Sequence, residues 1–396
     1  MPLPRLGYGR QSIDRSDIDA VVSALTSDFL TQGPVVDRFE AALAERCASR
    51  HAVAVSSGTA ALHLACLAAD LGATDIGVTS AITFAASANC LRYVGAEVAF
   101  TDINSRSLGP SVSVLGEMIA QQPAVRAIIP VHMAGLADSS AEIRALAGRR
   151  LVIEDAAHAV GGTYACGRPV GCGAYADMTI FSFHPVKTIT TGEGGAILTN
   201  DSELARRLRQ LRSHGIERDG TRFTDNDPRE DGDQKPWLYE QQMLGFNYRL
   251  TDIQAALGLS QLAKLDEFLA RRRAIVARYD EAFSKLRGIR LPQSSPQDRA
   301  RSAHHLYIAV FDFELLGTTR SRLMGQLAEA GIGTQVHYIP VYHHPYYIRR
   351  YAIDRANFPE AEAYYRGCLS LPLYPGLTDE DVERVVAAVT GLVSRP

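Results

Sequence analysis

The chain has 396 residues, of which 46% are hydrophobic and 21% are charged, and its formal net charge is -3 at pH 7. This balance is normal for a globular protein and argues against a general binder of nucleic acid or anionic membranes. The six cysteines are scattered and form no CxxC pair, so we expect no disulfide framework, no zinc site and a reducing, cytoplasmic location. Residues 1–10 lack an apolar core of signal-peptide length, and no stretch is long enough to span a bilayer.

Residues 1–34 are expected to form an N-terminal arm. Tyr8 lies between two glycines, a short helix is predicted over residues 16–25, and Gly33-Pro34 marks a turn. Thr31 and Gln32 come directly before that turn. The residues alone favour ordinary loop polarity for these two side chains, with contact to a ligand as the alternative.

A strand predicted at 52–55 is followed by a Ser/Gly/Thr turn, Ser56-Ser57-Gly58-Thr59-Ala60, which opens a helix to about Gly72. The first turn of a helix has free backbone N–H groups and a favourable dipole, and Gly58 lets an anion approach closely. The alternative is a plain N-cap by Ser57 or Thr59. The stretch lacks the Walker lysine and the three-glycine dinucleotide pattern, so neither nucleotide motif applies.

Short apolar strands alternate with helical segments through the first 200 residues. A helix is predicted from Phe84 to about Val94. The predicted strands are 52–55, 78–83, 97–102, 127–132, 152–155, 178–183 and 196–199. This alternation predicts an α/β fold with a mostly parallel, seven-stranded sheet covered by helices on both faces. Ligands of such sheets bind beyond the carboxyl ends of the strands.

Several residues with chemical potential follow those strand ends. Lys187 comes after the break at Pro185, where desolvation would favour a neutral, nucleophilic amine; the alternative is a surface lysine in a hairpin. Asp155 ends a buried strand and needs a cation, such as a protonated pyridine nitrogen, or a helix to cap. His158 is either a hydrogen-bonded core histidine or a group near a ring. Ser57 and Ser182 also lie at strand ends, and this convergence predicts one site.

The second half of the chain changes character. The polar run 218–236 is expected to be a mobile loop whose charges do no chemistry. Asn247 and Arg249 precede a capping box, Thr251 with Gln254, which begins a helix that continues through Lys264 toward Tyr279, with a bend. The residues alone favour loop polarity for Asn247 and Arg249. We expect a large domain over 35–250, and a linking helix with a small domain over 251–396.

The small domain is expected to be α+β. Its predicted strands are 305–311 and 334–338, and its predicted helices are 319–330, 358–367 and 378–392. An aromatic cluster over 335–347 contains His337, Tyr338 and two further histidines. No carboxylate or cysteine accompanies these histidines at ligand spacing, so we predict no metal there, but a stacking or hydrogen-bonding surface.

Together these motifs resemble the sugar aminotransferases of the DegT/DnrJ/EryC1/StrS family, from about residue 5 to the C-terminus. The stretches that carry the resemblance are Ser57-Gly58-Thr59-Ala60-Ala61-Leu62, Glu154-Asp155-Ala156-Ala157-His158, Phe181-Ser182-Phe183-His184 with Lys187, Glu193-Gly194-Gly195, Ser213-His214-Gly215, and Asn247 with Arg249-Leu250. The resemblance implies a fold-type-I enzyme that uses pyridoxal 5'-phosphate (PLP). It also implies a homodimer with shared active sites.

The resemblance further implies a role for each matching residue. Lys187 would bind the cofactor covalently and move protons, Asp155 would keep the pyridine nitrogen protonated, and His158 would lie near the ring hydroxyl, where most relatives have glutamine. The remaining cofactor-binding residues implied are Gly58, Thr59, Ala60, Phe84, Ser182 and, from the second subunit, Asn247. The substrate-binding residues implied are Tyr8, Thr31, Gln32, His184, Arg249, His337 and Tyr338.

Further stretches look most like the aminotransferases of pseudaminic acid biosynthesis. They are Leu30-Thr31-Gln32-Gly33, Ile189-Thr190-Thr191, residues 253–262, His305-Leu306-Tyr307 and Gln335-Val336-His337-Tyr338. We therefore expect transfer of an amino group from glutamate to C4 of a UDP-linked 4-keto-6-deoxy-N-acetylhexosamine. The first alternative is another 3- or 4-aminotransferase, acting on a GDP- or dTDP-linked keto sugar. A sugar dehydratase of the same family would have histidine in place of Lys187. A regulator without turnover would be expected to lose Lys187 or Asp155, and both are present.

Overall fold

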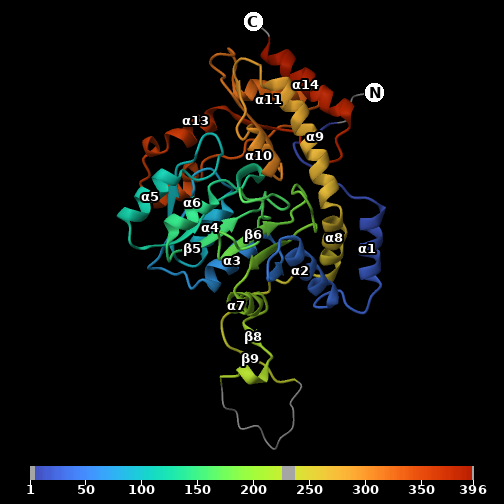
Figure 1. Cartoon of the computed structure of the whole chain (residues 1–396), viewed down its shortest axis with the longest axis vertical. Helices are drawn as coiled ribbons and strands as arrows, with labels where there is room; N and C mark the ends of the chain where they lie inside the picture. The colour runs from blue at the N-terminus through green and yellow to red at the C-terminus, as the bar shows by residue number, and fades with distance from the viewer. Residues whose placement is uncertain (1–4, 225–236, 395–396) are drawn as a thin grey trace, which may run out of the picture.

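The computed structural model describes residues 5–224 and 237–394 (Figure 1). At its centre is a seven-stranded sheet with the order β1-β7-β6-β5-β4-β2-β3. The strands are β1 His51–Val55, β2 Ile76–Ser80, β3 Glu97–Thr101, β4 Val125–Ile129, β5 Leu151–Asp155, β6 Met178–Ser182 and β7 Gly195–Thr199. Four of the pairings are parallel, and only β7 runs antiparallel to its two neighbours. The prediction of a mostly parallel, seven-stranded sheet is confirmed.

Helices cover both faces of this sheet, and successive residues of one strand serve different cores. Val53 and Val55 of β1 pack against one face, while Ala52 and Ala54 pack against the other. This is the result of the two-residue period of a strand that is buried on both sides. The first face is covered by α3 Gly58–Ala68, α4 Ala86–Tyr93 and α7 Ser202–Arg212, the second by α2 Pro34–Arg46 and α8 Asp252–Ala263, and the far end of the sheet by α5 Val112–Gln121 and α6 Ser140–Ala147.

The N-terminal arm is fastened to the outside of the large sheet by its helix, α1 Arg15–Leu25, which lies beside α8 (Figure 1). Asp17 is fully buried and accepts hydrogen bonds from Ser260, Gln261 and Lys264 at 2.6–2.9 Å. The predicted capping box of Thr251 with Gln254 is present at the start of α8. The predicted bend is also present.

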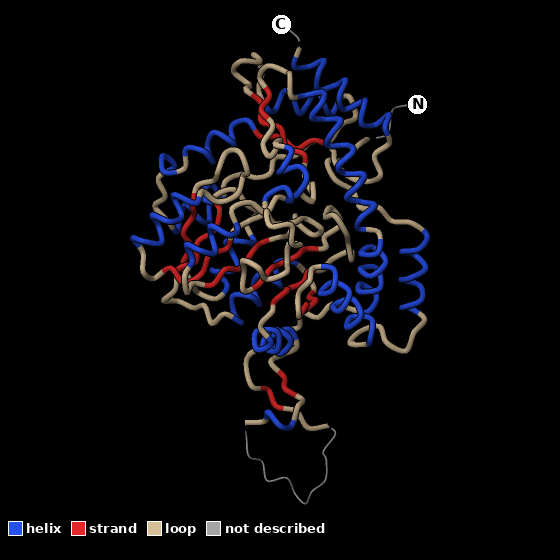
Figure 2. The backbone as a smooth tube through the Cα atoms, viewed as in Figure 1, coloured by secondary structure: helices blue, strands red, loops and turns tan. Residues whose placement is uncertain are grey.

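The bend in the linking helix falls at Lys264, where the backbone leaves helical geometry and α9 Leu265–Phe283 begins. Helix α9 then leads to the C-terminal region, which Figure 1 shows above the large sheet. A three-stranded antiparallel sheet lies there, in the order β10-β11-β12 (Figure 2). Its strands are β10 Ile289–Arg290, β11 Tyr307–Phe311 and β12 Cys368–Leu371, and the helices of this region are α10 Pro296–Arg301, α11 Arg320–Glu329, α12 Pro345–Arg350, α13 Pro359–Gly367 and α14 Asp379–Val393.

The strand predicted over 334–338 is wrong. Only Gln335 pairs, through an isolated bridge to Ser370 of β12, and β12 itself was not predicted. Beyond that bridge, the His337 ring forms a hydrogen bond with the Ser370 hydroxyl at 2.8 Å. The chain therefore leaves the sheet after one residue and continues as a wall of the cavity described below.

A two-stranded hairpin, β8 Ile216–Glu217 and β9 Glu240–Gln241, projects from the opposite end of the molecule (Figure 1). The predicted polar loop 218–236 begins in this hairpin, and its residues 225–236 lie outside the described part of the chain. Short 3-10 turns occupy Met133–Gly135, Gly220–Arg222, Val341–His343 and Arg355–Asn357. Within the described ranges, no helix combines the length and the apolar character that a membrane span requires.

Candidate active site

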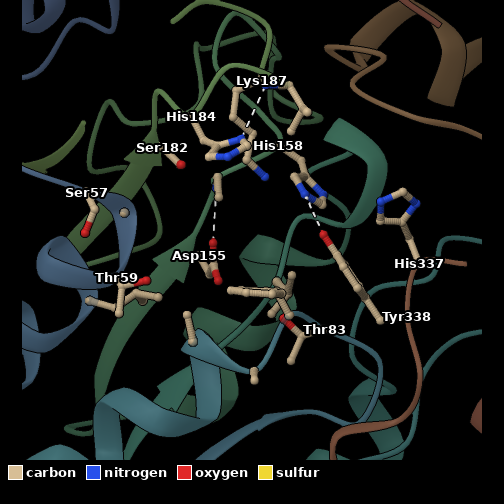
Figure 3. Close-up of a pocket in the computed structure, with 18 of the residues that line it drawn as sticks. Ser57, Thr59, Thr83, Asp155, His158, Ser182, His184, Lys187, His337 and Tyr338 are labelled. Atoms are coloured by element: carbon tan, nitrogen blue, oxygen red, sulfur yellow. Dashed lines mark hydrogen bonds between the residues drawn. The ribbon is translucent and has the colours of Figure 1, made fainter. Parts of the chain in front are cut away.

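A cavity of about 880 Å³ opens at the carboxyl edge of the large sheet (Figure 3). This volume is within the range of small-molecule binding sites. In Figure 3, Lys187 and Asp155 lie between the start of α3 on one side and Tyr338 and His337 on the other. The predicted site residues that line the cavity are Tyr8, Gly58, Thr59, Phe84, Asp155, His158, Ser182, His184, Lys187, His337 and Tyr338.

One wall is the turn that opens α3. Ser57 is its N-cap, and the Ser57 hydroxyl accepts a hydrogen bond from the Ala60 N–H at 3.1 Å. A Cβ on Gly58 would lie 2.9 Å from Cβ of Ser182, so only glycine lets this turn approach the end of β6. The first-turn N–H groups of Gly58 and Thr59 have no acceptor within the helix. The predicted cap and the predicted anion site are thus both compatible with one turn, whose positive dipole end faces the cavity.

Lys187 lies in the loop between β6 and β7. Backbone hydrogen bonds hold this loop: Lys187 N–H donates to the His184 carbonyl at 2.8 Å, and Thr191 N–H donates to the Phe183 carbonyl at 3.0 Å. Burial lowers the pKa of Lys187 to about 8, although the charge of Asp155 acts in the opposite direction. The amine is therefore far more often neutral at pH 7 than an exposed lysine would be.

Asp155 ends β5 and is almost fully buried. Each of its carboxylate oxygens accepts one hydrogen bond from the protein: Oδ2 from the Ser87 hydroxyl at 2.6 Å and Oδ1 from the Ala157 N–H at 3.1 Å. A carboxylate has about four acceptor positions, so further ones remain for a cationic or N–H ligand. The predicted partner, a protonated ring nitrogen, is chemically suited to them.

Three buried histidines gather beside these charged groups. The rings of His158 and His305 are 4.3 Å apart, and Tyr338 Oη is 3.3 Å from His158 Nε2 (Figure 3). Burial lowers the pKa of His158 and of His305 well below 6.5 and that of His337 to about 3, and the charge of Lys187 contributes to each shift. All three rings are therefore neutral at pH 7. Their part is to pack and form hydrogen bonds, not to supply charge.

Five predicted site residues lie outside this cavity. Ala60 is in the right turn, but its N–H is used by the Ser57 hydroxyl. The other four lie elsewhere on the chain: Thr31 bridges to Thr251, Asn247 to Ser213 and Arg249 to Val55, while Gln32 is exposed. They are not among the residues that line this cavity, so their predicted contacts with a ligand stay predictions.

The structure also places at the site two residues that were not among the predicted site residues. Ser87, on α4, forms a hydrogen bond with Asp155, and His305 packs on His158. The predicted helix from Phe84 begins only at Ala86, so Phe84 stands in the preceding turn and exposes 61% of its surface at the cavity wall. A signal for Ser87 was its spacing of four from Thr83, which places two hydroxyls on one side of an otherwise apolar segment.

In chemical terms the cavity joins a turn whose free N–H groups suit an anion, an amine with a lowered pKa and a carboxylate held by two hydrogen bonds. Such an amine can attack a carbonyl carbon and can also exchange protons. The part of the chain that the structure describes contains no group of three or more His, Cys, Asp or Glu side chains able to hold a metal ion.

Comparison with known proteins points to the same chemistry. Residues 11–390 match the DegT/DnrJ/EryC1/StrS aminotransferase family. The spore coat polysaccharide biosynthesis protein SpsC of Bacillus subtilis is 39% identical over 392 residues, which cover 98% of this chain and 97% of SpsC. The UDP-4-amino-4,6-dideoxy-N-acetyl-beta-L-altrosamine transaminase of Campylobacter jejuni is 38% identical over 381 residues, covering 96% of this chain and 95% of that enzyme.

Solved structures agree in fold. Helicobacter pylori PseC, an aminotransferase involved in the biosynthesis of pseudoaminic acid, has a TM-score of 0.87 at 29% identity, covering 98% of this chain and 99% of PseC. The PLP-form of the sugar aminotransferase Spr1654 from Streptococcus pneumoniae, described as putative, has a TM-score of 0.86 at 28% identity, covering 98% of both chains. The chain belongs to the DegT/DnrJ/EryC1/StrS aminotransferase family and is a PLP-dependent sugar aminotransferase.

Proposed function

We propose that this enzyme transfers an amino group from glutamate to C4 of a UDP-linked 4-keto-6-deoxy-N-acetylhexosamine, in pseudaminic acid biosynthesis. The observation that carries this proposal is the 38% identity, along almost the whole chain, to the UDP-4-amino-4,6-dideoxy-N-acetyl-beta-L-altrosamine transaminase. The structural likeness to PseC supports the same pathway. All six cysteines are free, and five of them are buried. This is compatible with a reducing compartment, so we place the reaction in the cytoplasm.

The cavity residues fit PLP in three respects. The N–H groups at the start of α3, with Ser182 opposite, suit its phosphate; the remaining acceptor positions of Asp155 suit its pyridine nitrogen; and the lowered pKa of Lys187 suits attachment to its aldehyde. When bound, PLP supplies a carbonyl that carries the amino group and a ring that withdraws electrons. Phe84 offers an apolar surface to that ring, and His158 a neutral hydrogen-bonding group.

Lys187 would have two duties. Its neutral Nζ would attach the cofactor. Once released by substrate, the same Nζ would remove the Cα proton of glutamate in the first half-reaction and deliver a proton to C4 of the keto sugar in the second. A group whose pKa is about 8 can both accept and donate a proton near neutral pH, which is what a single acid–base residue needs. The face from which Lys187 delivers the proton would set the configuration of the new amino group.

The charge balance of the cavity supports a shared site in a homodimer. Among the described residues that line it, Lys187 is the only lysine or arginine, against the carboxylates of Asp155 and Glu193. A sugar nucleotide brings a diphosphate, and glutamate brings two carboxylates, so further cations are required. Arg249 takes part in no ion pair within the described chain and is our proposed source, together with Asn247, from the second subunit.

An apolar surface supports the second copy. Ile18, Val22 and Leu25 lie on one face of α1 at helical spacing and are each about half exposed, as are Phe29 and Leu30 beyond the helix. Exposed apolar surface of this kind marks protein–protein contacts.

Subunit mixing tests the shared site. Lys187→Ala and Arg249→Ala chains, each inactive alone, are unfolded and refolded together in equal amounts. If Arg249 acts across the interface, half of the dimers are mixed and each has one intact site, so about a quarter of the wild-type activity returns. If Arg249 acts within its own chain, both sites of the mixed dimer are defective and no activity returns.

The substrate proposal is tested by product analysis. The purified, PLP-loaded enzyme is incubated with glutamate and a panel of UDP-, dTDP- and GDP-linked keto sugars, and amine transfer is scored by mass spectrometry. We expect transfer to the UDP-linked 4-keto sugar, none by Lys187→Ala, and normal transfer by Lys285→Ala, which changes an exposed lysine far from the cavity. Transfer only to dTDP- or GDP-linked sugars would refute the substrate. It would favour the alternative, an aminotransferase of a dTDP- or GDP-linked keto sugar. The likeness to SpsC, which is named for the biosynthesis of spore coat polysaccharide, is compatible with that alternative.

A further inference from the structure

We infer that Ser87 and Thr83 are positioning residues for Asp155, and that their two hydroxyls form a chain of hydrogen bonds that fixes this carboxylate for the cofactor ring. The inference rests on the proposed role of Asp155. It adds to the site two residues that are not proposed to bind substrate. Both lie 68 positions or more before Asp155 in the sequence.

The geometry determines the direction of each hydrogen bond. Ser87 Oγ is 2.6 Å from Asp155 Oδ2, and Thr83 Oγ1 is 2.7 Å from Ser87 Oγ. An ionised carboxylate only accepts, so Ser87 donates its single hydroxyl proton to Asp155. The bond between the two hydroxyls must then run from Thr83 to Ser87. The longer contact of Ser87 with the Phe84 carbonyl, at 3.3 Å, competes poorly.

Burial makes this chain of hydrogen bonds strong. Ser87 is fully buried and Thr83 nearly so, and Asp155 exposes only a few per cent of its surface. A hydrogen bond to a charged acceptor is about twice as strong as one between neutral groups, and each donor polarises the next in a low-dielectric interior. Removal of Ser87 Oγ would leave Oδ2 without its protein donor and the carboxylate held only by the Ala157 N–H, at 3.1 Å.

The same segment also contributes an aromatic ring to the cavity wall. Phe84, between Thr83 and Ser87, presents its exposed ring at the cavity wall, whereas the hydroxyls on either side of it in sequence lead to Asp155. A short turn thus sets the position of two cavity groups at once: the apolar ring and, through hydrogen bonds, the carboxylate. Holding the carboxylate through hydrogen bonds requires hydroxyl-bearing residues at these two positions, which alanine and valine could not replace.

Four variants test the inference. Ser87→Ala removes the direct donor, Thr83→Val removes the second hydroxyl at nearly constant shape, and Thr83→Ser retains it. Thr79→Val is the matched control, because Thr79 is equally buried in β2 but its hydroxyl donates to the Ile129 carbonyl at 2.9 Å and does not contact Asp155. Each protein is assayed for PLP affinity of the apoenzyme, for the pH midpoint of the visible absorbance of the loaded enzyme, and for thermal unfolding.

We expect Ser87→Ala to bind PLP roughly tenfold to a hundredfold more weakly, with a displaced absorbance midpoint. Thr83→Val should weaken binding by about threefold to tenfold, and Thr83→Ser should stay close to the parent. Thr79→Val should lose thermal stability without a change of midpoint. The inference is overturned if Ser87→Ala, or, should that variant not fold, Thr83→Val, keeps the parent affinity and midpoint, or if Thr79→Val shifts them equally.

Borohydride reduction and peptide mass spectrometry of the parent enzyme separate this inference from the function on which it rests. If the reduced cofactor is not found on Lys187, the proposed function itself is wrong. If it is found there and the Ser87 and Thr83 variants behave as the parent does, only the positioning role is lost.

Discussion

The lowered pKa of Lys187 can be tested quantitatively. Burial lowers its pKa from 10.5 to about 8. At pH 7 this raises the neutral fraction from about 0.03% to about one amine in ten, an increase of about 300-fold. The fall corresponds to about 3 kcal/mol of folding free energy. That cost is present in full below pH 8 and disappears as the pH rises to 10.5, because between these values the unfolded chain binds more protons than the folded one.

The assay measures the reactivity of individual amines in the apoenzyme. The protein is exposed briefly to an acylating reagent between pH 6 and 11, and the label on each lysine is quantified by peptide mass spectrometry. Labelling of Lys187 should rise with a midpoint near 8. Lys264 is the internal control: burial alone would lower its pKa, but hydrogen bonds to Asp14 and Asp17 raise it above 10.5.

Asp155→Asn sharpens the experiment. The charge of Asp155 raises the pKa of Lys187, so its removal should move the Lys187 midpoint below 8 and leave Lys264 unchanged. A midpoint for Lys187 at or above 10 in the parent protein would refute the claim that burial activates this amine. A midpoint near 8 that is unmoved in Asp155→Asn would refute the electrostatic coupling between the two residues.

Three further changes test how the fold supports the site. Gly195→Ala would place a Cβ 2.6 Å from the Ser57 carbonyl group, so we expect the free energy of unfolding in urea to fall by about 1–3 kcal/mol and inorganic phosphate to bind more weakly. The control is Gly325→Ala, which has no atom within 4 Å of its new Cβ and should be neutral or stabilising. Equal effects of the two changes would contradict this reasoning. Asp17→Ala should cost about 1–3 kcal/mol at neutral pH. Burial would raise the pKa of Asp17, but hydrogen bonds from Lys264 and its neighbours hold it below 3.8. The difference in unfolding free energy between wild type and Asp17→Ala should therefore shrink as the pH falls below 3.8. A difference that does not depend on pH would argue against an ionised Asp17. Tyr338→Phe removes only the 3.3 Å hydrogen bond to a neutral His158, so kcat/KM should fall by about threefold to tenfold, and a loss above a hundredfold would mean that the Tyr338 hydroxyl itself transfers a proton.

Local signals in the sequence predicted the parts of the fold that depend on neighbouring residues. The cap at Ser57 and the capping box at Thr251 are formed by side chains within three positions of the groups that they bind. The strands that carry Asp155 and Ser182 are short runs that begin with apolar residues, which predicts burial in a covered sheet. Because all of these strands except β7 run in one direction, their carboxyl ends meet, and the grouping of the site residues followed from that direction alone.

Other features depend on pairings between distant segments and could not be predicted in this way. Nothing in the sequence of β7 indicates that it lies antiparallel between β1 and β6. The apolar, aromatic stretch 334–338 has strand composition, but its pairing with β12 ends after Gln335, since His337 bonds to Ser370 through its side chain. The importance of Lys187 also came from resemblance, because a lone lysine in a loop has no local mark of burial.

Two different physical effects set the two reactive groups. Burial lowers the pKa of the Lys187 amine, and the three histidines beside it add no charge to that effect, since burial keeps each of them neutral. Asp155 is buried too, but two hydrogen-bond donors contact its carboxylate oxygens, the Ser87 hydroxyl and the Ala157 N–H. A change in packing around Lys187 should therefore alter its reactivity without moving Asp155, whereas loss of the Ser87 hydroxyl should act first on Asp155 and reach Lys187 only through the charge of that carboxylate.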